Sequence, residues 1–233
     1  MMGTFEPYLI GIVFCLVHLL APIVFRYRKR LEPHLSSVAG GFACSYIFLE
    51  LLPAVSTEHL LLGDRIYLII LGGFGFFLGI EYTLHHSKKM KDWVHVHASS
   101  GIAIAMVYNL LLAVAMIREV PQVPLAAALF AVLIGFHLLS TDLGLMEEHH
   151  KSFMQYGRFF LVGAIALGLC VHLVIEPSEQ AADVLAAIVT GTILYKVFSR
   201  ELPNFDEANA LSFCGGVAFF ALTHYLIELY SGG

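Results

Sequence analysis

Charged side chains are scarce in this chain. Asp, Glu, Lys and Arg make up 13% of its 233 residues, whereas a soluble globular domain usually carries about 25%. No basic stretch is interleaved with aromatic residues, which is the pattern of nucleic-acid binding. Hydrophobic residues account for 58%, and the mean hydropathy is +0.79. The composition therefore excludes an ordinary soluble domain and a nucleic-acid partner, and it predicts a protein whose solvent is the lipid bilayer.

Motifs of enzyme chemistry are also absent. The chain contains no G-x-S-x-G, H-E-x-x-H or P-loop pattern, so we expect no catalytic residues and no organic cofactor. The cysteines form no C-x-x-C pair and lie inside apolar runs, so we interpret them as small buried residues: Cys15, Cys44, Cys170 and Cys214. The start of the chain has no basic segment and no evident cleavage site, which favours a retained first helix.

Long apolar runs dominate what is present. A membrane-spanning helix needs about 20 mostly apolar residues. Eight stretches meet this requirement: 8–25, 35–54, 66–84, 98–117, 123–143, 157–175, 183–200 and 209–229. The connections between them are short, and most prolines fall at the edges of the runs, where helices start and stop. We therefore predict one all-α transmembrane domain, residues 1–233, with eight transmembrane helices.

The basic residues are segregated by this topology. One side holds Arg26, Arg28, Lys29, Arg30, Lys88, Lys89, Lys91, Lys151, Arg158, Lys196 and Arg200, which are 11 of the 13 in the chain. The other side holds Arg65 and Arg118. Cytoplasmic loops are enriched in lysine and arginine. This distribution predicts that both termini lie on the non-cytoplasmic side, and the short loops suit the inner or plasma membrane of a bacterial cell.

A weak internal repeat relates the second and seventh runs. Gly41-x6-Phe48-x3-Leu52-Pro53 matches Gly191-x6-Phe198-x3-Leu202-Pro203. The charge distribution makes these two runs cross the membrane in opposite directions. Inverted repeats of this kind are common in transporters, whose substrate sites lie near the membrane midplane.

Strongly polar residues within apolar runs are candidates for function, because each is costly in lipid unless it is paired or hydrated. Asn109 lies near the middle of the fourth run, and His137 and Asp142 lie in the fifth. Glu50 lies near the outer end of the second run. The remaining ones are interpreted as satisfied core histidines or solvated end residues: His18, Glu81, His172, His224 and Glu228. Asn109 is open to a second interpretation, as a polar contact between helices.

Histidines gather in the connections assigned to the cytoplasm. His85, His86, His95 and His97 surround the link after the third run, and His149 and His150 follow Glu147 and Glu148 after the fifth. Imidazole is the commonest metal ligand in proteins, and carboxylates can join it. These tracts are interpreted either as cytoplasmic metal-binding segments or as ordinary solvated loops.

Several stretches resemble the ZIP (Zrt/Irt-like) family of divalent-metal transporters. The segment Ala39-Gly40-Gly41 … Glu50-Leu51-Leu52-Pro53 is similar to the family's second span, and Gly191-Thr192-Ile193-Leu194-Tyr195 … Glu201-Leu202-Pro203 is similar to its seventh. Glu81 followed by His85 and His86 suits the third. The resemblance implies eight spans, termini outside, an inverted repeat of helices 1–3 and 6–8, and transport of zinc, iron or manganese toward the cytoplasm.

The resemblance also implies a metal site in the fourth and fifth spans. Asn109 matches one position of the fourth-span signature, and His137, Asp142 and Gly144 match positions in the fifth. The paired carboxylates of the family pattern are replaced by Leu112, Leu138 and Thr141. The expected ligands are therefore Asn109, His137 and Asp142, with Glu50 where ions arrive from outside.

Two alternatives stay open at the level of sequence. The missing carboxylates suit a non-transporting protein on the same scaffold that acts as a metal sensor, a regulator or a partner subunit. Histidines in the first, fifth, sixth and eighth runs would allow a bis-histidine haem protein that carries electrons. The expected partners are the lipid bilayer and a divalent metal ion as substrate, and whether the chain forms a homodimer is left undecided.

Overall fold

Helices make up the regular structure of this computed structural model. It describes residues 6–53, 63–87, 94–120, 123–174, 178–201 and 209–231, and no β-strand occurs within these ranges. The α-helices are α1 (Glu6–Tyr46), α3 (Arg65–Ser87), α4 (Val94–Glu119), α5 (Pro124–Ser152), α6 (Arg158–Val174), α7 (Glu179–Lys196) and α8 (Ala210–Ser231). Three π-helical segments join or extend them: η1 (Ile47–Leu51), η3 (Phe153–Gly157) and η4 (Val197–Glu201). The all-α prediction is confirmed.

Several helical stretches have the length and apolar character needed to cross a membrane. Within the described ranges these are Glu6–Tyr27, Arg65–Thr83, Pro124–Val171, Glu179–Ser199 and Ala210–Leu229, and shorter apolar stretches cover Ser37–Leu51 and Gly101–Met116. The stretch Pro124–Val171 is 48 residues long and covers most of two runs that were predicted as separate spans, 123–143 and 157–175. Large apolar side chains such as Leu68, Leu173 and Leu211 lie exposed on the outer faces, as lipid contact requires.

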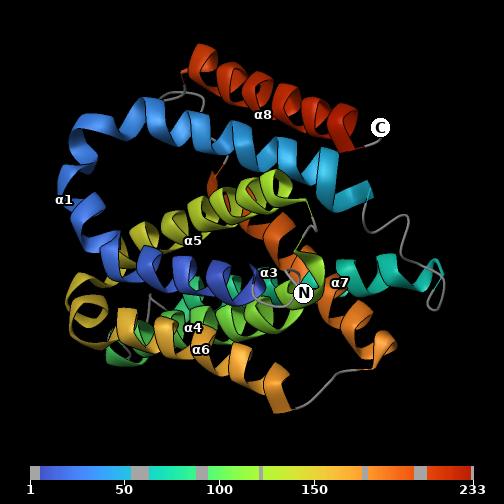
Figure 1. Cartoon of the computed structure of the whole chain (residues 1–233). Helices are drawn as coiled ribbons and strands as arrows, with labels where there is room; N and C mark the ends of the chain where they lie inside the picture. Colours follow the sequence, from blue (N-terminus) through green and yellow to red (C-terminus); the bar gives the residue numbers. More distant parts are fainter. Residues whose placement is uncertain are drawn as a thin grey trace.

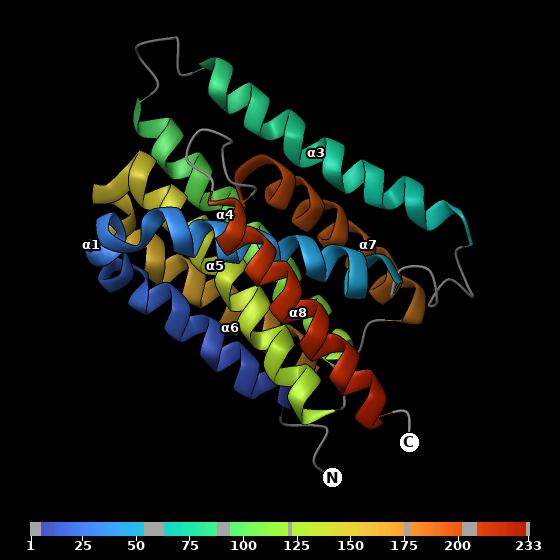
Figure 2. The same cartoon turned by 90° about the horizontal axis from the view of Figure 1, so that it is seen from above.

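Helix α1 contains the first predicted run and the first part of the second, which continues into η1. Its ribbon turns back on itself, so that a first arm (residues 6–27) and a second arm (residues 37–46) lie in different parts of the bundle (Figure 1). Pro33 falls between the arms in the sequence, and proline lacks the N–H that a straight helix needs at that point. The start of α1 and the end of α8 lie at the same end of the bundle in both views (Figures 1 and 2).

Glycines bring two helix pairs into backbone contact. The second arm of α1 packs against α8, and α7 packs against α3, which lies at one edge of the molecule (Figure 2). A Cβ added at Gly216 would lie 2.6 Å from the carbonyl oxygen of Val38, and one at Gly73 would lie 2.8 Å from that of Ile188. Added Cβ atoms at Gly41 and Gly191 would collide with backbone oxygens of α8 and α3 respectively. Small residues are what allow membrane helices to approach this closely.

The two π-helical segments η1 and η4 occupy matching places in the sequence repeat. Gly191 lies 150 positions after Gly41, and η4 begins 150 positions after η1 (197 − 47 = 150). Each segment is followed two residues later by a proline, Pro53 or Pro203. Because a proline ring clashes with the carbonyl four residues before it, the wider turn just ahead of Pro53 relieves that clash.

Candidate functional site

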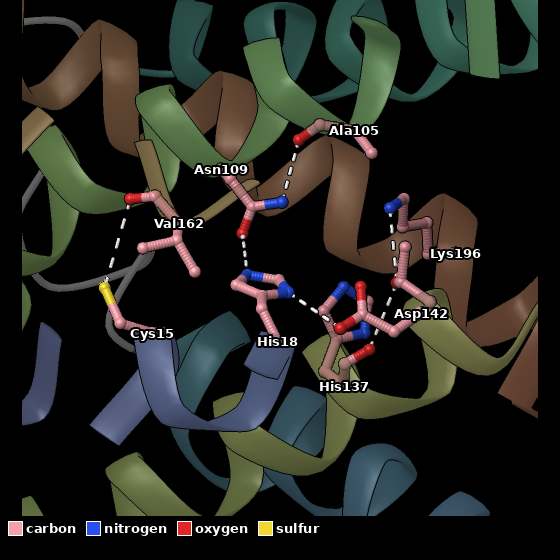
Figure 3. A network of polar contacts seen from close by, with 9 residues as sticks. Cys15, His18, Ala105, Asn109, His137, Asp142, Val162 and Lys196 are labelled. Carbon is pink, nitrogen blue, oxygen red and sulfur yellow. Dashed lines mark hydrogen bonds and ion pairs between the residues drawn. The ribbon is translucent and has the colours of Figure 1, made fainter. Parts of the chain in front are cut away.

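Three polar side chains from three helices meet in the interior. His18 of the first arm of α1 lies between Asp142 of α5 and Asn109 of α4 (Figure 3). The distance from Nδ1 of His18 to Oδ2 of Asp142 is 2.8 Å, and that from Nε2 to Oδ1 of Asn109 is 3.1 Å. All three residues are 0% exposed. Buried polar groups are normally hydrogen-bonded, and each of these three side chains bonds at least one other polar group.

Hydrogen-bond accounting assigns the protons of this cluster. Nδ2 of Asn109 donates to the carbonyl oxygen of Ala105 at 2.8 Å, so Oδ1 is the atom that faces His18. Oδ1 can only accept, and Nε2 of His18 therefore carries a hydrogen. The contact at Nδ1 then needs one further proton, held either by His18 or by Asp142. In both arrangements the His18–Asp142 pair is electrically neutral as a whole.

One oxygen of Asp142 is not used by the cluster. Within the part of the chain that the structure describes, the buried Oδ1 of Asp142 has no hydrogen-bond partner. An unsatisfied buried acceptor costs about 1–3 kcal/mol and is uncommon in folded proteins. Such an atom is chemically suited to accept a hydrogen bond from a ligand or to coordinate a cation.

His137 lies beside the cluster on the same helix as Asp142. Its side chain is 4% exposed and meets the ring of Tyr108 edge-on, with ring centroids 5.7 Å apart. Tyr108 precedes Asn109 on α4 and is itself fully buried. His137 and Asp142 are five residues apart, about 140° around a helix, and Figure 3 shows both side chains in the same region. Asn109 and Asp142 thus meet at His18, and His137 lies in the same region (Figure 3), while the role of the three as metal ligands stays a prediction.

Lys196 enters the same region from α7. Its Nζ donates to Oγ1 of Thr141 at 3.3 Å and lies 4.3 Å from the centroid of the Tyr108 ring. Thr141 directly precedes Asp142, so the ammonium lies next to the cluster (Figure 3). A cation over the face of an aromatic ring is attracted by the ring's electrons. Neither Lys196 nor His18 was a sequence-predicted site residue, because helix rotation decides which residues meet.

Glu50 lies in a different cluster. Its Oε1 accepts from Nδ1 of His224 on α8 at 2.9 Å, and Nε2 of His224 lies 3.7 Å from Oε1 of Glu228. The imidazole also stacks on Phe220, one turn earlier. Because the two ring nitrogens point in opposite directions, the two carboxylates do not converge on one point. Glu50 therefore fastens η1 to α8 and is not part of the His18 cluster.

A second polar contact joins α7 to α3. The hydroxyl of Tyr195 donates to Oε2 of Glu81 at 2.7 Å, and the Tyr195 ring meets Phe74 edge-on. Glu81 was interpreted as a solvated end residue, but here its carboxylate accepts a hydrogen bond from the neighbouring helix. The signal available in the sequence was only the place of Glu81 at the end of an apolar run.

Replacing Tyr195 with phenylalanine should lower the free energy of unfolding by about 1 kcal/mol, because it removes the hydroxyl that donates to Glu81. Unfolding in mixed micelles measures this effect. Tyr225→Phe is the matched control, since Tyr225 on α8 is 58% exposed. Equal stabilities for the two variants would show that the Tyr195–Glu81 contact contributes nothing.

The histidines of the links that the sequence assigns to the cytoplasm are only partly described. His85 and His86 end α3, and His95 and His97 begin α4, but their side chains lie outside the described residues. His149 interrupts the helical backbone of α5, with φ −140° and ψ 45°, and its Nε2 lies 3.8 Å from Oε2 of Glu148. His150 packs on the ring of Phe25. Their metal-binding role stays a prediction, and His172 is likewise not described at the side-chain level.

Comparison with known proteins adds no assignment: no protein-family model, curated protein or solved structure matches the chain. Among the described side chains, no group of three or more His, Cys, Asp or Glu is arranged to hold a metal ion. The set of Asn109, His137 and Asp142 is not such a group, because Asn109 contributes an amide and is none of these four residue types.

Proposed function

We propose that the protein is a ZIP-like membrane transporter that carries a divalent metal cation, such as zinc, iron or manganese, toward the cytoplasm. The observation that carries this proposal is the buried Oδ1 of Asp142, which has no hydrogen-bond partner in the described residues. It lies in a cluster that also offers an imidazole at His137 and an amide oxygen at Asn109. These are nitrogen and oxygen ligands of the kinds that zinc, manganese and iron accept.

The matched helix contacts support an inverted repeat. Gly41 and Gly216 join the second arm of α1 to α8, and Gly191 and Gly73 join α7 to α3. Gly191 on α7 lies 150 positions after Gly41 on α1, and Gly216 on α8 lies 143 positions after Gly73 on α3 (216 − 73 = 143). The two helix contacts therefore occupy matching positions, with α7 corresponding to α1 and α8 corresponding to α3. Such repeats are common in transporters, which place their site where the two halves meet.

We infer eight spans with both termini outside the cytoplasm. The start of α1 and the end of α8 lie at the same end of the bundle (Figure 2). A chain that crosses the membrane an even number of times has both of its termini on one side. In this arrangement ions arrive near Glu50, pass the cluster around Asp142 and leave near the histidines of the cytoplasmic links. One group of helices rocks against the other to open the cluster to each side in turn.

A second candidate is a non-transporting protein on the same scaffold, acting as a metal sensor, a regulator or a partner subunit. The position of Lys196 favours it, because an ammonium next to Asp142 opposes the binding of a second cation. A chain that binds metal but moves none across a membrane would establish this alternative.

Metal uptake into proteoliposomes tests the proposal. We expect the wild-type chain to accumulate zinc, manganese or iron, and we expect Asp142→Asn and His137→Ala to lower the rate by more than about tenfold, since each removes a ligand from the path. Asp64→Asn is the control, because Asp64 lies in an exposed turn before α3.

Two results would count against transport. Equal rates for the wild-type chain and both site variants would remove the cluster from the path. Rates no higher than those of protein-free vesicles, for all three metals, would overturn the proposed function itself.

A further inference from the structure

We propose that Lys196 is a tethered cation, meaning a positive charge fixed to the protein that competes with the metal ion for the region of Asp142. Its ammonium sets how tightly the cluster holds a divalent cation, and its displacement accompanies metal binding. This inference rests on the proposed function and adds a residue that determines affinity, contributed by α7.

The geometry places the ammonium against the residues that directly precede two of the candidate ligands. Nζ of Lys196 is 3.3 Å from Oγ1 of Thr141, the residue before Asp142. It is 4.3 Å from the ring centroid of Tyr108, the residue before Asn109. The ammonium on α7 therefore contacts the residue that precedes a candidate ligand on α5 and the residue that precedes another on α4.

The electrostatics make this charge relevant to a bound ion. Asp142 is fully buried, and the ammonium of Lys196 is hydrogen-bonded to the side chain of the residue directly before it. Interactions between charges are much stronger in a protein interior than in water, because little solvent is present to screen them. An ammonium that attracts the carboxylate in the empty cluster repels a divalent ion that arrives there. A metal ion is therefore held weakly while the lysine stays in place, and tightly only when the lysine moves away.

The position of Lys196 differs from that of a lysine that is merely solvated. Long basic side chains near helix ends normally extend their charge into water. Lys196 is instead half-buried in the last turn of α7, with its charge over the Tyr108 ring and bonded to Thr141. Its contacts also cross from α7 to α4 and α5. Displacing it therefore loosens one polar link of α7 to α4 and α5.

Three substitutions separate charge from size. Lys196→Gln removes the charge and keeps a polar end, and Lys196→Met keeps an unbranched side chain to cover the Tyr108 ring. Lys196→Arg keeps the charge. Lys151→Gln is the matched control, because Lys151 is an exposed lysine at the end of α5.

Zinc binding to the purified chain in detergent, measured by calorimetry on monodisperse fractions, tests the inference. We expect Lys196→Gln and Lys196→Met to bind zinc at least about tenfold more tightly than the wild-type chain. Lys196→Arg and Lys151→Gln should bind as the wild type does. Adding Asp142→Asn to Lys196→Gln should abolish the gain.

The outcomes distinguish this inference from the proposed function. If both neutral variants bind zinc no more tightly than the wild type, while Asp142→Asn still stops uptake, the tethered cation is wrong and the transporter stands. If the arginine variant also binds more tightly, the effect is not one of charge and the inference fails. If no variant binds or transports any of the three metals, both proposals fail together.

Discussion

His18→Ala is expected to lower the free energy of unfolding by about 3–5 kcal/mol, one of the largest effects of any single substitution considered for this protein. The substitution leaves the fully buried Asp142 facing a cavity with neither oxygen bonded, and it removes the partner of Asn109. A buried acidic group that loses its partner is far more costly than a lost neutral hydrogen bond between membrane helices, which averages about 0.6 kcal/mol.

Reversible unfolding in mixed micelles measures the loss, and His224→Ala supplies a matched control. His224 also bonds a carboxylate, but the side chain of Glu50 is 40% exposed, whereas that of Asp142 is fully buried. Exposed ion pairs contribute about 0–1 kcal/mol, so this control should lose little. A loss at His18 no larger than that at His224 would contradict the role assigned to the buried cluster.

A double-mutant cycle identifies the pair responsible. If His18 and Asp142 stabilise each other, the double variant His18→Ala with Asp142→Ala should lose clearly less than the sum of the two single losses. Additive losses would mean that the 2.8 Å contact carries no coupling energy.

Gly191→Ala is expected to lower the free energy of unfolding by about 2–3 kcal/mol, because the new methyl group collides with the backbone of α3 at Ile70. Backbone cannot rotate aside as a flexible side chain can, so α7 and α3 have to separate. That separation also weakens the neighbouring contact at Gly73. Thermal unfolding in detergent and the yield of folded protein both report the effect.

Gly75→Ala on α3 is the control for this substitution. A Cβ at Gly75 meets nothing within 4 Å, so alanine there should leave the stability unchanged or raise it by up to about 1 kcal/mol through its better helix propensity. The adjacent glycines of α8 give a second matched test, since Gly216 faces the second arm of α1 and Gly215 faces open space. Equal stabilities within each pair would contradict the close helix contacts.

The helix positions could be predicted from the sequence to within a few residues in most cases. The run 66–84 corresponds to α3, 157–175 to α6 and 209–229 to α8. Where prediction and structure differ, the helix continues through polar residues beyond the end of the predicted apolar run. Helix α5 extends to Ser152, beyond residue 143, because a helix emerging from the apolar region keeps its own backbone hydrogen bonds.

The candidate site could be predicted only in part. Asn109, His137 and Asp142 were identified because each is strongly polar within an apolar run. His18 has the same character but was interpreted as a satisfied core histidine, and it is satisfied by two members of the site itself. Glu50 was grouped with the ligands but bonds His224 instead. Its charge was visible in the sequence, whereas its partner was not.

The amino-acid order alone determined that the chain is helical and suited to lipid, because the length and polarity of a segment are local properties that each segment satisfies by itself. Tertiary structure alone decided which polar groups meet. That outcome depends on how far each helix is rotated and shifted against its neighbours, and glycines such as Gly41 and Gly191 fix those positions through backbone contacts between residues far apart in the chain.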